Sequence, residues 1–144
     1  MLVSQILKSK GSEGVLTVTP ETLVSEAAKI LAEKGIGTVM VSVDGEVPAG
    51  ILSERDIVRE LARSGSGCLK DSVETYMTSN LVTCGRNDDA VEVLEKMTQG
   101  RFRHMPVLED GKLVGLVSLG DAVKARLSEL AMEKDALQGM IMGH

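Results

Sequence analysis

Two short stretches of the chain place an aspartate three residues after a serine. Ser53 and Asp56 close the run Gly-Ile-Leu-Ser-Glu-Arg-Asp, and Ser118 and Asp121 fall in the run Gly-Leu-Val-Ser-Leu-Gly-Asp. A carboxylate can accept hydrogen bonds from vicinal ribose hydroxyls, and a serine hydroxyl can donate to a phosphate or ribose oxygen. If each serine begins a helix, the free N–H groups there also attract phosphate. The pattern therefore predicts two corners suited to sugar and phosphate groups.

The same residues have a simpler interpretation. A serine before the first helical turn, with an acidic residue three positions later, satisfies backbone N–H groups as in a capping box. A glycine before two apolar residues permits a tight start to a strand. The motif on its own leaves ligand binding and helix capping equally open.

The two stretches belong to a duplicated unit. Their first glycines are 115 − 50 = 65 residues apart, and the matches upstream follow a shift of 66, so one residue near Pro48 has no counterpart. Two copies of one unit favour a pseudo-symmetric pair over an extended solenoid. Residues that recur at the shift of 66 are Thr17, Glu26, Val41, Asp44 and Gly45, matched by Thr83, Glu92, Val107, Asp110 and Gly111.

Each copy reads as β-α-β-β-α, which predicts an α+β fold of tandem repeats related by a pseudo-twofold axis, with a C-terminal helix. Thr19, Pro20 and Gly35 are typical of helix ends, and the Asp-Gly pairs are typical of turns. In the first copy we expect a helix over 19–34, strands over 38–43 and 49–52, and a helix over 53–63. In the second copy we expect a helix from Asn87 or Asp88, strands over 104–108 and 113–117, and a helix opened by Ser118.

Helical spacing predicts which side chains face the core. The expected inward-facing residues are Ile57, Val58 and Leu61 in the first copy, and Val91, Leu94 and Met97 in the second. The run Ser64 to Gly67 predicts a flexible connection. The tail over 127–143 is expected to be helical, with apolar residues suited to a core or dimer contact: Leu130, Leu137, Met140 and Ile141. The expected organisation is repeat 1 with an N-terminal segment (1–66), repeat 2 (67–128) and the tail (129–144).

The entrance to one strand differs between the copies. Arg101, Phe102, Arg103 and His104 stand where the first copy has the small or apolar run 35–38. The arginine guanidinium binds phosphate through bidentate hydrogen bonds, and histidine can donate a hydrogen bond near neutral pH. We expect an anion cradle here, with a solvated loop as the alternative, and room for a flat base against the first-copy run.

Composition narrows the function classes. The chain of 144 residues is 43% hydrophobic and 26% charged, with a net charge of −5, which fits a soluble globular protein without a basic field for nucleic acid or anionic lipid. No signal peptide or membrane span is expected, and Cys68 and Cys84 lack metal-ligand spacing, so we expect a cytoplasmic protein without a bound metal. No nucleophile elbow, P-loop or HExxH motif is present, which argues against an enzyme.

From about Val15 to Leu127 the chain resembles the CBS-domain pair, or Bateman module. The resemblance lies in the repeat length, the element order, both serine–aspartate motifs and the runs SERD, RFRHMPV, DGKLVG and SLGD. Serine replaces the threonine frequent in the family motif, and this preserves the hydroxyl. The resemblance implies two clefts between the repeats. One would use Val15, Ile36, Gly37, Thr38, Arg103, His104, Ser118, Gly120 and Asp121. The second would use Ser53, Arg55, Asp56, Thr83 and Phe102.

The resemblance also implies a function. We expect a non-catalytic regulatory or energy-sensing module that binds an adenosine compound: AMP, ADP, ATP, NAD or S-adenosylmethionine. Mg²⁺ would enter only with ATP. The Asp121 cleft, with more cationic groups, is expected to be the tighter one. A homodimer and an unidentified protein effector are the expected partners. The alternative is a structural dimerisation module without a physiological ligand.

Overall fold

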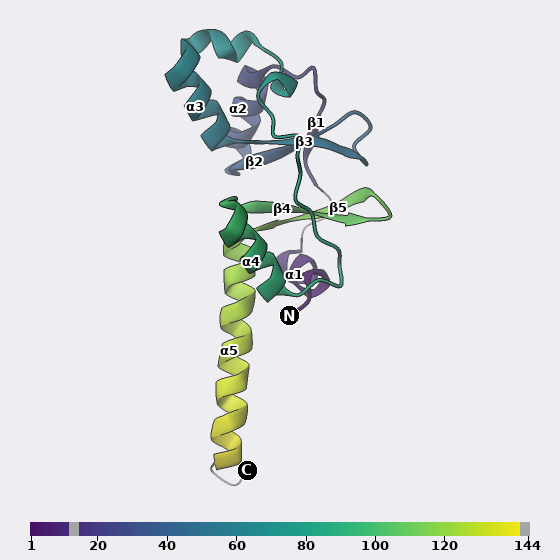
Figure 1. Ribbon diagram of the computed structural model, residues 1–144, viewed down its shortest axis with the longest axis vertical. Coiled ribbons are helices and arrows are strands. Elements are labelled where there is room, and N and C mark those ends of the chain that lie inside the picture. Colours follow the sequence, from purple (N-terminus) through teal and green to yellow (C-terminus); the bar gives the residue numbers. More distant parts are fainter. Residues whose placement is uncertain (12–14, 142–144) are drawn as a thin grey trace. The chain divides into compact units, whose positions relative to one another are not determined.

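The computed structural model describes residues 1–11 and 15–141, which group into two compact units (Figure 1). The first-repeat unit comprises Gly14–Leu81 and Glu109–Val114. The second-repeat unit comprises Met1–Glu13, Val82–Leu108 and Gly115–His144.

The first-repeat unit contains a three-stranded sheet in the order β1-β2-β3. Strand β1 runs parallel to β2, and β2 pairs antiparallel with β3, where Val41 faces Gly50. Every residue of β2 is buried. Its three central residues are apolar, as expected for a strand covered on both faces, and only its end residues, Thr38 and Ser42, are polar. The elements are β1 (Thr17–Val18), α2 (Val24–Lys34), β2 (Thr38–Ser42), β3 (Pro48–Ser53), α3 (Glu54–Ser64) and the 3-10 helices η1 (Gly65–Lys70) and η2 (Val73–Thr75).

The second-repeat unit repeats this order around the two-stranded sheet β4-β5. The counterpart of β1 is reduced to one parallel bridge between Cys84 and Val107. Helix α5 continues without interruption from the repeat into the tail. The elements are α1 (Val3–Lys10), α4 (Ala90–Gly100), β4 (His104–Glu109), β5 (Lys112–Ser118) and α5 (Leu119–Ile141), of which the end of β4 and the start of β5, within Glu109–Val114, are grouped with the first-repeat unit.

Each unit borrows the segment that precedes the other repeat. Helix α1, at the start of the chain, packs in the second-repeat unit, where Val3 and Ile6 are buried. The segment after η1 packs in the first-repeat unit, where Val73 is buried and Thr78 exchanges two backbone hydrogen bonds with Ile51 of β3 (3.0 and 2.9 Å). The two units therefore exchange their leading segments.

The α+β architecture, the strands, the turns and the C-terminal helix agree with the sequence predictions, but two helix starts were wrong. Helix α2 begins at Val24, not Thr19, because Leu23 forms a bridge with Ser72 that holds the chain extended. Helix α4 begins at Ala90, capped by Asp89, because that residue forms a bridge with Leu2. In both copies a borrowed segment delays the helix.

Some inward-facing assignments were also wrong. Ile57 is buried, but Val58 and Leu61 are 64% and 37% exposed. In α4 the fully buried residues include Val93 rather than Val91 or Leu94, which are partly buried; Met97 is buried as expected. The predicted flexible connection is a short 3-10 segment, since η1 starts at Gly65. The last predicted tail residues, 142 and 143, lie outside the described residues.

Both cysteines are buried free thiols. Burial, with a smaller contribution from the nearby Asp88 carboxylate, raises the pKa of Cys84 to about 11. A thiol with so high a pKa is protonated at neutral pH and therefore a poor nucleophile.

Candidate functional site

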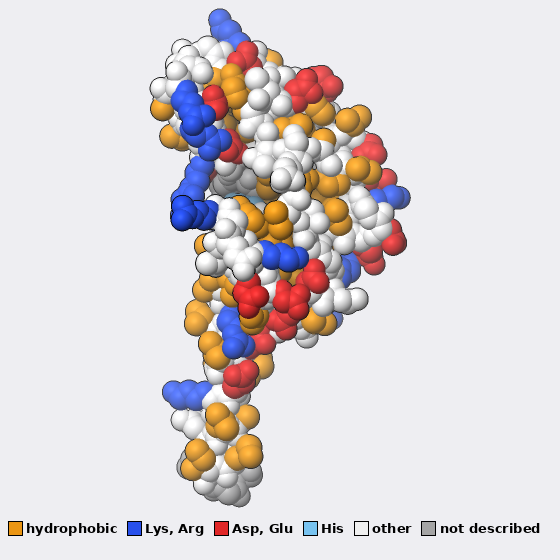
Figure 2. Space-filling view, viewed as in Figure 1, with side chains coloured by type: hydrophobic (Ala, Val, Ile, Leu, Met, Phe, Trp, Pro, Cys, Tyr) orange, Lys and Arg blue, Asp and Glu red, His pale blue; other side chains and the backbone are white. Residues whose placement is uncertain are grey.

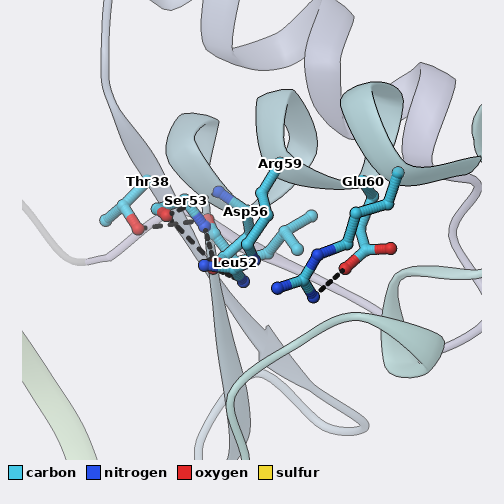
Figure 3. A network of polar contacts seen from close by, with 7 residues as sticks. Thr38, Leu52, Ser53, Asp56, Arg59 and Glu60 are labelled. Atoms are coloured by element: carbon cyan, nitrogen blue, oxygen red, sulfur yellow. Dashed lines mark hydrogen bonds and ion pairs between the residues drawn. The ribbon is translucent and has the colours of Figure 1, made fainter. Parts of the chain in front are cut away.

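The first serine–aspartate pair, Ser53 and Asp56, lies where β3 meets α3 and is called the Asp56 corner (Figure 3). Asp56 Oδ2 accepts hydrogen bonds from the Ser53 backbone N–H (2.9 Å) and hydroxyl (3.0 Å), and the Ser53 hydroxyl accepts from the Asp56 N–H (3.2 Å). The second oxygen, Oδ1, accepts from Arg59 Nη2 at 2.7 Å. This is a complete capping box with an added ion pair. Asp56 is buried, and both of its carboxylate oxygens are engaged.

The second corner repeats this arrangement where β5 meets α5. Asp121 Oδ2 accepts from the Ser118 N–H (2.9 Å), and the Ser118 hydroxyl accepts from the Asp121 N–H (3.1 Å). The cation here is Lys10, whose Nζ lies 2.7 Å from the same Oδ2. Among the described residues, none donates to Oδ1 of Asp121. The Asp121 corner therefore keeps one carboxylate oxygen for an external donor, whereas the Asp56 corner does not.

The local charge of the second corner follows from these contacts. Burial by itself raises the pKa of Asp121, but hydrogen bonds from Lys10 and Ser118 and the positive charge of Lys10 outweigh it, so the pKa lies below its usual value. Asp121 is consequently ionised at neutral pH, the state in which both carboxylate oxygens are hydrogen-bond acceptors.

A loop closes onto each helix start. The Glu54 N–H donates to the carbonyl of Gly37 (2.9 Å), and the Leu119 N–H donates to the carbonyl of Arg103 (2.7 Å). These are equivalent positions of the two copies, so the loop before β2 and the loop before β4 lie beside the serine of their own copy. The arginine-rich loop is thereby placed next to the Asp121 corner.

The motif glycines have a packing role. A side chain at Gly50 would meet Met77 and would lie 3.1 Å from the carbonyl oxygen of Thr78. A side chain at Gly115 would lie 2.6 Å from Leu7 Cδ2. The expected role at the start of a strand was wrong, because Gly50 lies inside β3 and Gly115 lies inside β5. The glycines instead leave room for the borrowed segment of each unit.

The residues predicted for each cleft are divided between the two units, so their combination across the units stays a prediction. Thr38 is buried, and its hydroxyl donates to the Leu52 carbonyl (3.1 Å), which commits it to the sheet. Val15, Ile36, Gly37, Thr38, Ser53, Arg55 and Asp56 lie in the first-repeat unit. Thr83, Phe102, Arg103, His104, Ser118, Gly120 and Asp121 lie in the second-repeat unit.

The sequence interpretation missed two cations of the corners. Arg59 follows Asp56 by three residues on one helix, and such i,i+3 charge pairs are a recognisable signal. Lys10 comes from a helix more than a hundred residues away along the chain, and no local pattern connects it to Asp121.

The described part of the chain offers neither a metal-binding cluster nor a membrane-spanning helix. No group of three or more His, Cys, Asp or Glu side chains there could hold a metal ion. None of the helices in the same ranges combines the length and apolar character that a membrane crossing demands.

The fold and the paired corners define a tandem-repeat protein in which a serine–aspartate cap begins the last helix of each repeat. The CBS domain profile matches this chain twice, at residues 3–63 and 73–128, and the chain belongs to the CBS domain family.

Curated relatives include the mitochondrial CBS domain-containing protein CBSX3 of Arabidopsis thaliana, 32% identical over 98% of this chain and 72% of the relative. A second Arabidopsis relative, CBSCBSPB1, is 31% identical over 89% of this chain, which spans about 24% of that longer protein.

Solved structures share the fold. The CBS-domain protein ATU1752 from Agrobacterium tumefaciens matches with a TM-score of 0.83 and 44% identity, over 88% of this chain and 99% of that one. PAE2072 from Pyrobaculum aerophilum, complexed with AMP, matches with a TM-score of 0.78 and 26% identity over 92% and 99%. The CBS pair of MJ0100, in complex with 5′-methylthioadenosine and S-adenosyl-L-methionine, gives 0.78 and 26% over 90% and 98%.

Proposed function

We propose that this chain is a non-catalytic regulatory module that binds an adenosine-containing ligand at the Asp121 corner. The observation that carries the proposal is the carboxylate of Asp121, which is ionised and keeps Oδ1 without a donor among the described residues. A pair of ribose hydroxyls is a suitable donor for such an oxygen. Related CBS pairs hold AMP in one case, and methylthioadenosine and S-adenosylmethionine in another, which supports an adenosine compound.

The remaining roles are proposed for residues of both repeats, as the family resemblance implies. Ser118 and the start of α5 would serve the phosphate, since helix N-termini favour anions, and Gly120 in the first turn leaves that start uncovered by a side chain. Arg103 and His104 would lie on the phosphate side. Val15 and the run 36–38 would supply the surface for the adenine.

The Asp56 corner would be the weaker site. Both of its carboxylate oxygens already accept hydrogen bonds, so a ribose would have to displace Arg59 or share an oxygen with it. Arg55, Thr83 and Phe102 would complete this second cleft. The candidate ligands are AMP, ADP, ATP, NAD and S-adenosylmethionine, and Mg²⁺ would be bound only together with ATP. A cytoplasmic location is consistent with a sensor of such nucleotides.

Titration of the purified protein tests the proposal. Calorimetry with AMP, ATP, NAD and S-adenosylmethionine is expected to show saturable binding of at least one compound. In parallel, a ligand at a hundred times its Kd should raise the free energy of unfolding by about 2.7 kcal/mol, seen as a higher Tm. Absence of heat and of a Tm shift with every compound would contradict ligand binding.

A structural module is the second candidate, and the capping boxes favour it. Both serine–aspartate pairs satisfy helix N–H groups without any ligand. If the nucleotide panel gives no response, the corners act as caps alone, and the function lies in association with a partner.

Self-association is the partner interaction that we propose. Five exposed apolar residues of α5 fall on a six-position series with alternating spacings of four and three, as at the interface of a coiled coil, and Figure 2 shows apolar side chains along the end of this helix. A helix with this spacing is self-complementary, so the occupant that we infer is a second copy of the chain. The apolar members are Val123, Leu127, Leu130, Leu137 and Ile141, and the remaining position of the series is occupied by Lys134.

Charges placed in this series are expected to separate the dimer. The double change Leu127→Glu and Leu130→Glu should convert a dimer to a monomer, because it puts like charges on both copies of the interface. Sedimentation equilibrium measures the mass. Val43→Glu, at a position 77% exposed and outside α5, is the control and should leave the mass unchanged. A dimer that survives the double change would place the interface elsewhere.

A further inference from the structure

The two aspartates differ in the origin of their cations. Asp56 takes Arg59 from its own helix, so that ion pair belongs to α3 alone. Asp121 takes Lys10 from α1, the segment that the second-repeat unit borrows from the chain start. The Asp121 corner is thus completed by a cation from a different element.

Packing fixes the position of Lys10. Val3 and Ile6 of α1 are fully buried or nearly so, and Leu7 lies against Gly115 of β5. The Lys10 ammonium donates to the Leu116 carbonyl (2.9 Å) as well as to Asp121 Oδ2 (2.7 Å). Its side chain is 31% exposed, so it lies at the surface of the corner and is not enclosed in the core. A ligand held by Oδ1 of Asp121 would therefore bind next to a positioned positive charge.

The positive charge of Lys10 changes which ligand charge the Asp121 corner attracts. An aspartate alone repels a phosphate and attracts a cation, whereas the Lys10–Asp121 pair has no net charge and still offers Oδ1 as an acceptor. Arg103, whose backbone carbonyl accepts from Leu119 N–H beside the same corner, belongs to a loop that adds positive charge. The electrostatic balance at this corner favours an anionic ligand.

We propose that Lys10 is a specificity-determining residue that makes the Asp121 corner select 5′-phosphorylated adenosine compounds over uncharged or cationic ones. The proposal rests on the function proposed above and narrows its ligand class. AMP is anionic, adenosine has no charge and S-adenosylmethionine carries a sulfonium cation, so these three probes separate charge selection from recognition of the nucleoside.

Calorimetric titrations of the full chain with the three probes test this role. In Lys10→Met the affinity for AMP is expected to fall roughly tenfold, which is the effect of losing about 1.4 kcal/mol of favourable interaction. Adenosine should bind as before, and S-adenosylmethionine should bind equally well or more tightly. Lys10→Arg should retain the preference for AMP. Lys8→Met is the matched control, since it removes the same charge from an exposed residue of the same helix turn and should leave the three affinities in their original order.

Three outcomes would overturn the proposal. Equal losses for AMP and adenosine in Lys10→Met would mean that Lys10 only supports the corner. An unchanged affinity for AMP would mean that its charge is not felt by the ligand. Tighter binding of S-adenosylmethionine than of AMP by the original protein would reverse the predicted selectivity. If Lys10→Met fails to fold, Lys10→Gln keeps a hydrogen-bond donor for Leu116 without the charge and answers the same question.

If the proposed adenosine-binding function is wrong, the titrations give a different result from those above. If the original protein binds none of the three probes, adenosine recognition itself is wrong. If it binds adenosine and AMP equally and Lys10→Met changes neither, the ligand class is wrong while the adenosine site survives.

Discussion

Asp121→Ala is expected to weaken AMP binding about a hundredfold or more. The carboxylate would accept two charge-assisted hydrogen bonds from the ribose, each worth roughly 1.5–3 kcal/mol, and alanine offers none. Isothermal calorimetry measures the loss. Because the aspartate also caps α5, we expect the free energy of unfolding to fall by about 1 kcal/mol, which leaves the protein folded at 25 °C.

The matched variant is Asp56→Ala in the other repeat. It removes the same group from the same motif, but both oxygens of Asp56 already serve Ser53 and Arg59. We therefore expect less than about a fivefold change in AMP affinity, together with a comparable loss of a cap. If the two variants exchanged these effects, the free oxygen of Asp121 would not be the feature that determines binding.

Gly50→Val is expected to cause the largest loss of stability, about 3 kcal/mol. The Cβ atom would lie 2.8 Å from Met77 Cγ and 3.1 Å from the Thr78 carbonyl oxygen. Methionine can adjust, but Thr78 is held by two backbone hydrogen bonds to Ile51, so the backbone contact cannot relax without breaking them. Thermal unfolding should show Tm lower by roughly 6 to 12 °C.

Two variants check this cause. Gly67→Val is the control, because no described atom beyond the adjacent residues and the backbone of its own helix lies within 4 Å of the place where its Cβ would be. It should change Tm far less. Gly50→Val combined with Met77→Ala should recover part of the loss, since the smaller side chain makes room for the valine. A double variant no more stable than Gly50→Val would show that the backbone contact at Thr78 dominates.

Features set by neighbouring residues were predictable from the sequence. The start of α3 was predicted because Ser53 and Asp56 form their capping box within one turn. The end of α2 was predicted because Gly35 takes a left-handed conformation (φ 63°) that glycine adopts at little cost. The repeat itself made the architecture of one copy a prediction for the other.

Features set by distant segments could not be predicted in this way. The starts of α2 and α4 depend on bridges from Leu23 to Ser72 and from Asp89 to Leu2. The partner of Asp121 depends on how α1 packs, and nothing in the sequence near Asp121 specifies Lys10. Val58 was misplaced because the apolar residues of α3 form one broad face, and helical spacing alone does not say how much of that face is covered.

Because the two units exchange their leading segments, the two repeats cannot be separated into independent domains by one cut in the chain. A chain severed after Ser64 would give one fragment that carries α1 without β5, its packing surface, and another that carries Met77 without the strand that it covers. Neither fragment would be a finished domain, although each holds a whole copy of the sequence motif.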